Sequence, residues 1–338
     1  MRTLSSFGAT VCAVAFLFIS INGCSGSASD SGTGGTAGSG GMGGGANVDE
    51  LFAPGPYEVG YREFPVTYTA AASGADRELL LRVWYPAVAD SGADPARYAL
   101  SNDVISIDLG AGIALDAPPV NEESGFPFVV HSHGNGGEGL LAYPYGELMA
   151  SHGWILVAPN HTGNTAFDFL DVPDPGTRSA LDRPHDITAV IDEFESGLSG
   201  DELAGKADTS SVFVFGQSAS CEVLADPDVE AAYRAGFGDP RVVALAPQAP
   251  ALVSIAEGEL AALEVPTMLM TGRLDQTTTL EEQALPAWMG IDHPDDFWVE
   301  MPKGAHFTFI TICHDLTEDL LLFFRPDANE DGCGPGFI

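Results

Sequence analysis

The sequence has few basic side chains. Only 13 of its 338 residues are Lys or Arg, against 48 Asp or Glu, and the formal net charge is -35. Binding to the phosphates of nucleic acids requires clustered cations. The composition therefore excludes nucleic acid as an expected partner, and it argues against attraction to anionic lipid. A surface this acidic favours solubility at high salt concentration, where the repulsion between carboxylates is screened.

Long hydrophobic runs are also missing. Residues 7–21 form an apolar run that is too short to span a bilayer, and the sequence "INGC" follows at once. These four residues match a bacterial lipobox, so we expect residues 1–23 to be a lipoprotein signal peptide, with cleavage before Cys24 and acyl chains on that residue. An ordinary secretory signal followed by a chance cysteine is the alternative.

The stretch after Cys24 has no side chains that can build a core. Residues 24–46 are rich in Gly and Ser and form a flexible tether with a reach on the order of 25 Å. Residues 47–338 have the length of one large α/β domain. We therefore expect an exported lipoprotein of the bacterial cell envelope, at the outer membrane or cell surface or released from it. The lipid anchor would be its only contact with the membrane.

Cysteine is sparse, with five residues in the whole chain and no Cys-x-x-Cys or His-Glu-x-x-His spacing. We expect no metal and no organic cofactor. In an exported protein Cys313 and Cys333 are predicted to form a disulfide that holds the C-terminal tail near His306. The tail sequence "DANEDG" (residues 327–332) resembles the start of a calcium loop, but the twelfth position is Ile338 rather than Glu. A polar turn is the preferred interpretation.

Short apolar runs alternate with helical patterns along the chain. Most of the runs are continuously hydrophobic, which is typical of strands covered on both faces. The expected strands are residues 62–70, 78–86, 126–134, 153–161, 211–218, 242–250, 265–272 and 296–302. The expected helices are residues 143–152, 184–196, 220–236 and 281–289. This order predicts an α/β fold with a mostly parallel sheet. Two longer polar connections, residues 97–125 and 162–183, are expected to cover or line a site.

Three residues at the carboxyl ends of expected strands suggest a catalytic triad. Ser218 ends the run "SVFVFGQS", Asp275 follows a buried strand, and His306 follows the last strand. A serine hydroxyl needs a base to take its proton, imidazole titrates near neutrality, and a carboxylate fixes the tautomer of the ring. The chain order Ser, Asp, His is the one that α/β-hydrolases use.

The turn at Ser218 departs from the Gly-x-Ser-x-Gly pattern of a nucleophile elbow, because Ser220 takes the place of the second glycine. Serine is only one hydroxymethyl group larger, so Ser218 remains the expected nucleophile. The tetrahedral oxyanion needs two backbone N–H donors. We expect one from Ala219, directly after the nucleophile, and one from Asn135 in the glycine-rich loop "HGNGG".

These motifs resemble the α/β-hydrolase branch that contains platelet-activating-factor acetylhydrolases and bacterial predicted dienelactone hydrolases. The matching stretches are "LLLRVWYPA", "FVVHSHGNGG", "LMASHGWILVAPNHTGNT", "RPHDITAVIDEF", "VFVFGQSAS", "VPTMLMTGRLD" and "KGAHFTF". The resemblance implies an α/β-hydrolase fold, with Ser218, Asp275 and His306 as the triad. The family elbow usually has His before the serine, whereas this chain has Gln217. Dienelactone hydrolases proper use a cysteine nucleophile, so the serine favours hydrolysis of ordinary esters.

Several alternatives remain open at this point. Asp295 and Asp296 are rivals of Asp275, and Asp186 is interpreted as a helix cap or first-turn acid. His131 and His133 are expected to orient the glycine-rich loop through hydrogen bonds. The candidate pocket residues are Tyr143, Tyr145, Phe167 and Phe169. The expected function is a serine esterase acting on a small or polymeric ester with a short or accessible acyl group. The alternatives are an amidase or peptidase with the same triad, and a non-catalytic binding lipoprotein.

The lipobox interpretation leads to a prediction about Cys24. Replacing Cys24 with Ala should leave an uncleaved precursor or free the domain from membranes, because the thiol that accepts the lipid is lost. Cell fractionation and the mass of the mature protein measure both effects. A variant that is processed and fractionates like the unchanged protein would contradict the interpretation.

Overall fold

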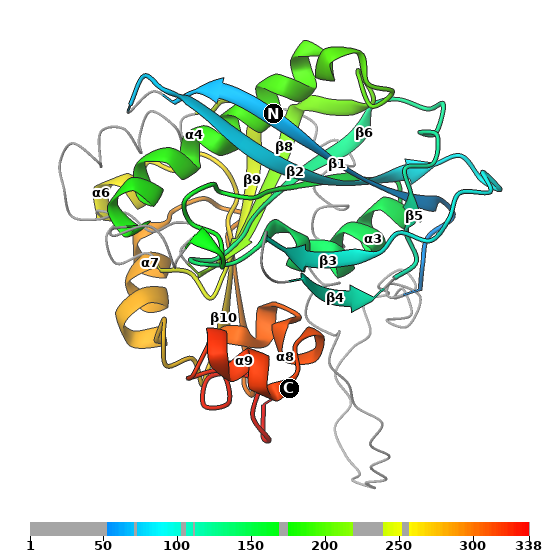
Figure 1. Cartoon of the computed structure of the whole chain (residues 1–338). Helices are drawn as coiled ribbons and strands as arrows, with labels where there is room; N and C mark the ends of the chain where they lie inside the picture. Colours follow the sequence, from blue (N-terminus) through cyan, green and yellow to red (C-terminus); the bar gives the residue numbers. More distant parts are fainter. Residues whose placement is uncertain are drawn as a thin grey trace, which may run out of the picture. The chain divides into compact units, whose positions relative to one another are not determined.

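A nine-stranded sheet forms the centre of the fold (Figure 1). The computed structural model describes residues 53–70, 73–102, 106–110, 112–168, 175–218, 239–251 and 257–337. The strand order is β11-β10-β9-β8-β6-β7-β2-β1-β5, and β3 and β4 pair separately. The strands are β1 (Glu58–Thr69), β2 (Asp76–Ala87), β3 (Tyr98–Ser101), β4 (Ser106–Gly110), β5 (Leu115–Asp116), β6 (Phe126–Ser132), β7 (Ile155–Pro159), β8 (Ala207–Gln217), β9 (Val242–Gln248), β10 (Met268–Gly272) and β11 (Phe297–Met301).

Helices and short helical turns connect these strands. The α-helices are α3 (Tyr143–Ser151), α4 (Pro175–Ser196), α6 (Glu257–Leu260), α7 (Leu285–Gly290), α8 (Ile312–Asp315) and α9 (Glu318–Phe324). The 3-10 turns are η1 (Gly139–Ala142), η3 (Leu198–Gly200) and η6 (His306–Phe309), and η5 (Leu280–Ala284) is a π-helical turn.

The strand directions place several loops at one edge of the sheet. Each pairing in the run β7, β6, β8, β9, β10, β11 is parallel, and the β1–β2 hairpin is antiparallel. The mostly parallel α/β sheet predicted from the sequence is therefore present. From β6 the chain continues to β7 on one side, and β8 lies on the other side. Sites in such sheets form where the order reverses, outside the carboxyl ends of the strands.

Both faces of the sheet are covered, which explains the continuous apolar runs. In β2 the side chains of Leu81 and Val83 belong to the core beneath α4. Trp84, the next residue, lies on the opposite face and directly against Gly146 of α3. Successive residues of a strand point to opposite faces, so both sets of positions are apolar here.

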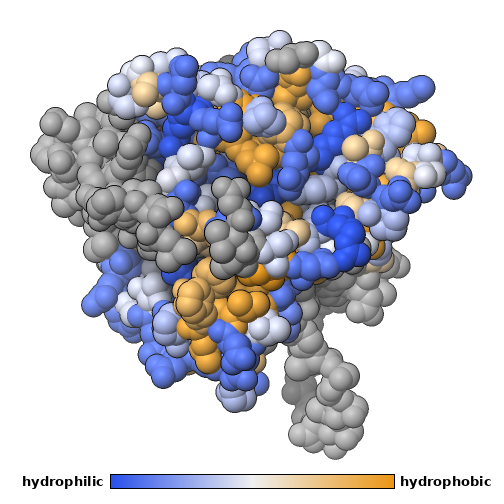
Figure 2. Space-filling view, in the orientation of Figure 1, coloured by the Kyte–Doolittle hydropathy of each residue, from blue (hydrophilic) through white to orange (hydrophobic). Residues whose placement is uncertain are grey.

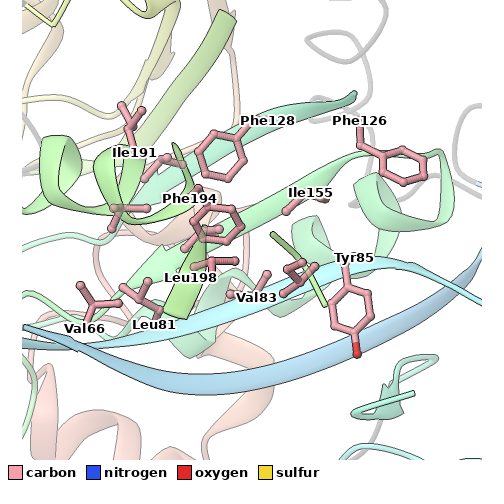
Figure 3. Close-up of a cluster of buried hydrophobic side chains, with 14 of the residues drawn as sticks. Val66, Leu81, Val83, Tyr85, Phe126, Phe128, Ile155, Ile191, Phe194 and Leu198 are labelled. Carbon is pink, nitrogen blue, oxygen red and sulfur yellow. The ribbon is translucent and has the colours of Figure 1, made fainter. Parts of the chain in front are cut away.

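A core cluster of buried side chains lies between the sheet and α4 (Figure 3). Phe194 and Ile191 of α4 face the sheet there, and the rings of Phe194 and Phe128 have centroids 4.7 Å apart. Leu198 of η3 continues the same apolar surface beyond the end of the helix. This packing fixes α4 against β6 and β8, the two strands that lead into the predicted site.

The structure differs from the sequence-based expectation in both long connections. Helix α4 begins at Pro175, so part of the connection expected at residues 162–183 is helical, and Pro184 lies inside the helix. The helix expected at residues 184–196 therefore starts nine residues earlier than its sequence pattern indicates. Residues 97–125 contain β3, β4 and β5, which are too short to produce a clear period. The helix expected at residues 220–236 lies outside the described residues.

The C-terminal part of the chain contains the predicted disulfide, Cys313–Cys333. The displayed surface is mostly hydrophilic, with a hydrophobic patch over α8 and α9 (Figure 2), where Phe323 is 69% exposed. No helix in the described ranges combines the length and the hydropathy needed to cross a bilayer.

The disulfide should contribute measurably to stability. It closes a loop with a sequence separation of 20 residues, and the loss of that constraint on the unfolded chain should lower the free energy of unfolding by about 3 kcal/mol. Urea unfolding of the Cys313→Ser/Cys333→Ser variant, compared with the oxidised protein, measures the difference. Equal unfolding midpoints would contradict this expectation.

Candidate active site

Ser218 lies directly after β8, in a strained turn. Its φ of +58° is in the left-handed region, which is unfavourable for a residue with a Cβ atom and is common where function requires it. This conformation is the one expected of the serine in a nucleophile elbow. The predicted oxyanion donor Ala219, the anomalous Ser220 and Cys221 lie outside the described residues.

His306 contacts both of the other predicted triad residues. It begins η6 after β11 and is only 4% exposed. Its Nε2 atom lies 2.9 Å from Ser218 Oγ, and its Nδ1 atom lies 3.1 Å from Asp275 Oδ2. The structure thus brings together three side chains that are separated by up to 88 positions in the sequence. This order of contacts is the one a general base needs to take a proton from serine.

Asp275 is fixed by the loop that follows β10. Its Oδ1 atom accepts hydrogen bonds from the backbone N–H groups of Thr277 (2.9 Å) and Thr278 (2.6 Å). The Thr278 hydroxyl lies 2.8 Å from Asp275 Oδ2 and 3.2 Å from His306 Nδ1. Sequence reasoning missed Thr278, although a carboxylate that bonds to backbone N–H groups two and three residues later is a common turn pattern.

The rival carboxylates of Asp275 lie elsewhere. Asp296 precedes β11, and its oxygens accept hydrogen bonds from Thr267 N and His293 N, both at 2.8 Å. It therefore fixes a turn at the amino end of β11, whereas His306 follows the carboxyl end of that strand. Asp295 precedes it in the same turn, and its N–H donates to His293 Nδ1.

The glycine-rich loop after β6 packs against the turn of Ser218. A Cβ atom added to Gly134 would lie 2.5 Å from Gln217 Oε1 and 3.3 Å from Ser218 Cβ. A glycine therefore suits this close approach of the loop, and Asn135 is the next residue of the same loop. The Asn135 carbonyl accepts a hydrogen bond from Arg325.

Gln217, the residue before Ser218, has a contact of its own. Its side chain is 4% exposed, and its Nε2 atom donates a hydrogen bond to the carbonyl of His306 at 3.1 Å. The residue before the predicted nucleophile therefore holds the backbone of the predicted base.

A second Ser-His-Asp arrangement lies buried beneath the glycine-rich loop. Ser132 Oγ is 2.9 Å from His161 Nε2, and His161 Nδ1 is 2.8 Å from Asp186 Oδ2. Arg183 also donates to Ser132 Oγ at 3.1 Å. Because the Asp186 carboxylate can only accept, His161 carries its proton on Nδ1. Burial lowers the pKa of this ring well below its ordinary value, so the ring is neutral and its Nε2 atom accepts the hydrogen bond of the Ser132 hydroxyl. His161 and Asp186 are fully buried, so this set has no access to substrate.

The buried set connects to the predicted oxyanion loop through Arg183. Its guanidinium donates to the carbonyl of His133 and to Asn164 Oδ1 (3.0 Å), and Asn164 Nδ2 donates to Asn135 Oδ1 at 2.7 Å. His133 Nε2 accepts a hydrogen bond from the His161 N–H at 3.0 Å. The Nδ1 atom of His133 lies 2.8 Å from the carbonyl of Gly134, so the expected hydrogen bond from His133 to the loop is present.

Two expectations about this region are wrong. Asp186 is not a helix cap: it lies inside α4, and its oxygens accept hydrogen bonds from Arg77 (2.7 Å) and Tyr68 (2.7 Å) as well as contacting His161. His131 does not hydrogen-bond to the loop, since neither of its ring nitrogens has a partner in the described part of the chain. Instead it packs against the ring of Phe215, with a centroid distance of 4.7 Å.

Two of the aromatic residues expected in a pocket hold the segment after His306. The Tyr145 hydroxyl donates to the Phe309 carbonyl at 2.7 Å, and the Tyr143 hydroxyl donates to Asp315 Oδ1 at 3.0 Å. Phe167 contacts the ring of Phe324 in α9. Phe169 lies outside the described residues. Among the residues that are described, no three His, Cys, Asp or Glu side chains form a group that could hold a metal ion.

The strand order, the covered sheet and the placement of the three predicted triad residues are those of an α/β-hydrolase fold. A solved structure supports this: the chain resembles a ferulic acid esterase from Streptomyces cinnamoneus, with a TM-score of 0.59 and 21% identity over 83% of this chain and 85% of that one. No family model matches the chain, and no curated protein matches it by sequence. At this identity the likeness shows the fold alone.

The buried histidines predict a pH dependence of stability. Burial lowers the pKa of His131 to about 3, and it lowers the pKa of His133 and His161 well below the ordinary value. Below about pH 6.5 the unfolded chain then binds protons that the folded protein excludes. Stability should fall with decreasing pH by about 1.4 kcal/mol per pH unit for each such histidine.

His131→Leu tests this, because it removes one titrating ring without breaking a described hydrogen bond. Urea unfolding between pH 5 and 6 should show a slope shallower than the original by about 1.4 kcal/mol per pH unit. The control is His314→Gln, which replaces an exposed side chain and leaves the three buried rings in place. An unchanged slope in the His131 variant would refute the prediction.

Proposed function

We propose that the protein is a serine hydrolase that cleaves carboxylic esters with short or otherwise accessible acyl groups. One observation carries the proposal: the chain of contacts from Ser218 through His306 to Asp275, with Ser218 strained at the carboxyl end of β8. The similarity to an esterase of known structure supports the fold that this chemistry requires.

In the proposed reaction His306 Nε2 takes the hydroxyl proton of Ser218 while Oγ attacks the ester carbonyl carbon. Asp275 keeps the imidazole proton on Nδ1 and stabilises the imidazolium. His306 then gives the proton to the departing alkoxide oxygen, and an acyl-enzyme remains. Water attacks this ester with the same proton transfers and releases the acid and the free serine. These steps require no cofactor.

We assign the stabilisation of the oxyanion in the tetrahedral intermediate to the backbone N–H groups of Asn135 and Ala219. Within the described residues the Asn135 N–H has no hydrogen-bond partner, and the loop that carries it lies against Ser218 through Gly134. The assignment of Ala219 rests on its position in the sequence.

The finer assignments rest on the sequence. The quoted motifs favour the branch of platelet-activating-factor acetylhydrolases and predicted dienelactone hydrolases, with an ordinary ester in place of a dienelactone because the nucleophile is serine. We further propose an exported lipoprotein anchored through Cys24, and the Cys313–Cys333 disulfide suits such an oxidising compartment.

A series of p-nitrophenyl esters of increasing acyl length, together with methyl ferulate, tests the proposed substrate class. We expect turnover of the esters and much slower turnover of a matched p-nitroanilide. Comparable rates on the anilide would favour an amidase. If a fluorophosphonate fails to label Ser218, a non-catalytic binding role would be favoured.

The roles of Ser218 and Ser220 can be separated by substitution. Ser218→Ala should lower kcat on the order of 10³-fold or more, with the fold retained, because the nucleophile is lost. Ser220→Gly should remain active, since it restores the usual glycine of the elbow. Circular dichroism and ester turnover measure both variants. Activity that survives in Ser218→Ala and disappears in Ser220→Gly would show that the elbow has another register.

A further inference from the structure

The chain after α9 returns to the loops of the candidate active site. Residues 326–332 form consecutive turns, and in Figure 1 this C-terminal part lies beside α8 at the end of β10. Gly332 has a φ of +139°, and a Cβ atom there would lie 2.9 Å from Phe307 N. A glycine at this position lets the tail pass directly against the residue that follows His306.

Asp331, one residue earlier, joins the loop of the predicted acid to the predicted base. Its Oδ1 atom accepts hydrogen bonds from the backbone N–H groups of Gln276 (2.9 Å) and His306 (3.3 Å). Its Oδ2 atom accepts from the Thr277 hydroxyl at 2.7 Å, and its carbonyl accepts from Phe307 N at 3.0 Å. One residue of the tail therefore contacts the two residues after Asp275, as well as His306 and its neighbour.

The burial of this carboxylate is costly. Asp331 is 2% exposed, and in the part of the chain that the structure describes it forms no salt bridge. A buried charge requires several hydrogen bonds to offset its desolvation, and a neutral side chain would avoid that cost. The three donors to its carboxylate all belong to the loops of the candidate triad. The hydrogen bonds that offset the desolvation of Asp331 therefore connect it to these loops.

The hydrogen bonds of Asp331 distinguish between the two interpretations of the "DANEDG" motif, a calcium loop and a polar turn. Asp331 is the fifth residue of the motif, a position that supplies a ligand in a calcium loop. Here both of its oxygens are directed to N–H and O–H donors, which a cation would have to displace. The motif forms the polar turn expected from the sequence, and the carboxylate faces the candidate active site.

We infer that Asp331 is a positioning residue: it holds the Asp275 loop and His306 in the relative geometry that proton transfer requires. The inference rests on the proposed serine hydrolase function and adds to it a residue outside the triad. The Cys313–Cys333 disulfide fixes the tail next to Asp331. Asp331 acts through backbone groups and does not contact the reacting atoms.

Three variants test this role. Asp331→Ala removes all carboxylate contacts. Asp331→Asn keeps an oxygen for the two backbone N–H groups, and its amide can donate to Thr277 Oγ1. Glu330→Gln is the control, because it changes the charge of the adjacent, exposed residue. The measurements are kcat and KM for a p-nitrophenyl ester, the rate of fluorophosphonate labelling of Ser218, and the folded fraction from circular dichroism.

We expect Asp331→Ala to lower kcat per folded molecule by about 10²-fold, the scale of a misplacement of about 1 Å, with KM unchanged within about twofold. Labelling should slow in parallel. Asp331→Asn should recover most of this loss, and Glu330→Gln should match the original protein. If activity falls only in proportion to the folded fraction, or if Asp331→Ala keeps the original kcat, the positioning role is overturned. If the unchanged protein is neither labelled nor active, the proposed function itself fails.

Discussion

The contact between Ser218 Oγ and His306 Nε2 is the constraint on which the rest of the arrangement depends. A length of 2.9 Å between residues on two different connections leaves little freedom to either backbone. The serine side is fixed by a strained turn at the end of a buried strand, and strain of this kind persists only where the surroundings over-determine it. Three residues fix His306. Asp275 contacts its ring, Asp331 accepts from its backbone N–H, and Gln217 donates to its carbonyl.

Hydrogen bonds between buried polar groups around this contact form two systems. One connects the acid loop, the base and the C-terminal tail. The other extends from Asp186 through His161 and Ser132, and Arg183 joins it to the glycine-rich loop. Both lie at the carboxyl ends of the parallel strands. The apolar packing of α4 stabilises the sheet. The two hydrogen-bonded systems set the geometry of the loops at the carboxyl ends of its strands.

The strands with continuous apolar runs could be predicted from the sequence. Continuous apolar runs such as residues 126–134 and 211–218 became parallel strands, since burial on both faces leaves a clear pattern. The sequence also identified three residues that lie in contact, although their chemical roles stay a prediction. It could not identify Thr278, Asp331 or the inward orientation of Asp186, because a polar residue in a loop or inside a helix has the same local pattern whether it faces solvent or a buried partner. The start of α4 was predicted wrongly for a related reason. Tertiary packing outweighs the local preference against proline within a helix, and Pro184 lies inside α4.

The position of the tail has a consequence for the order of biosynthesis. Asp331 and Cys333 come after Ser218, Asp275 and His306 in the chain, so every residue of the proposed triad is translated before the segment that joins its loops. The bond from Cys313 to Cys333 also requires an oxidant, which a reducing cytosol does not ordinarily provide for structural disulfides. In a chain exported as we propose, the tail would therefore be fixed next to Asp331 only once the disulfide has formed, later than the synthesis of every residue of the proposed triad.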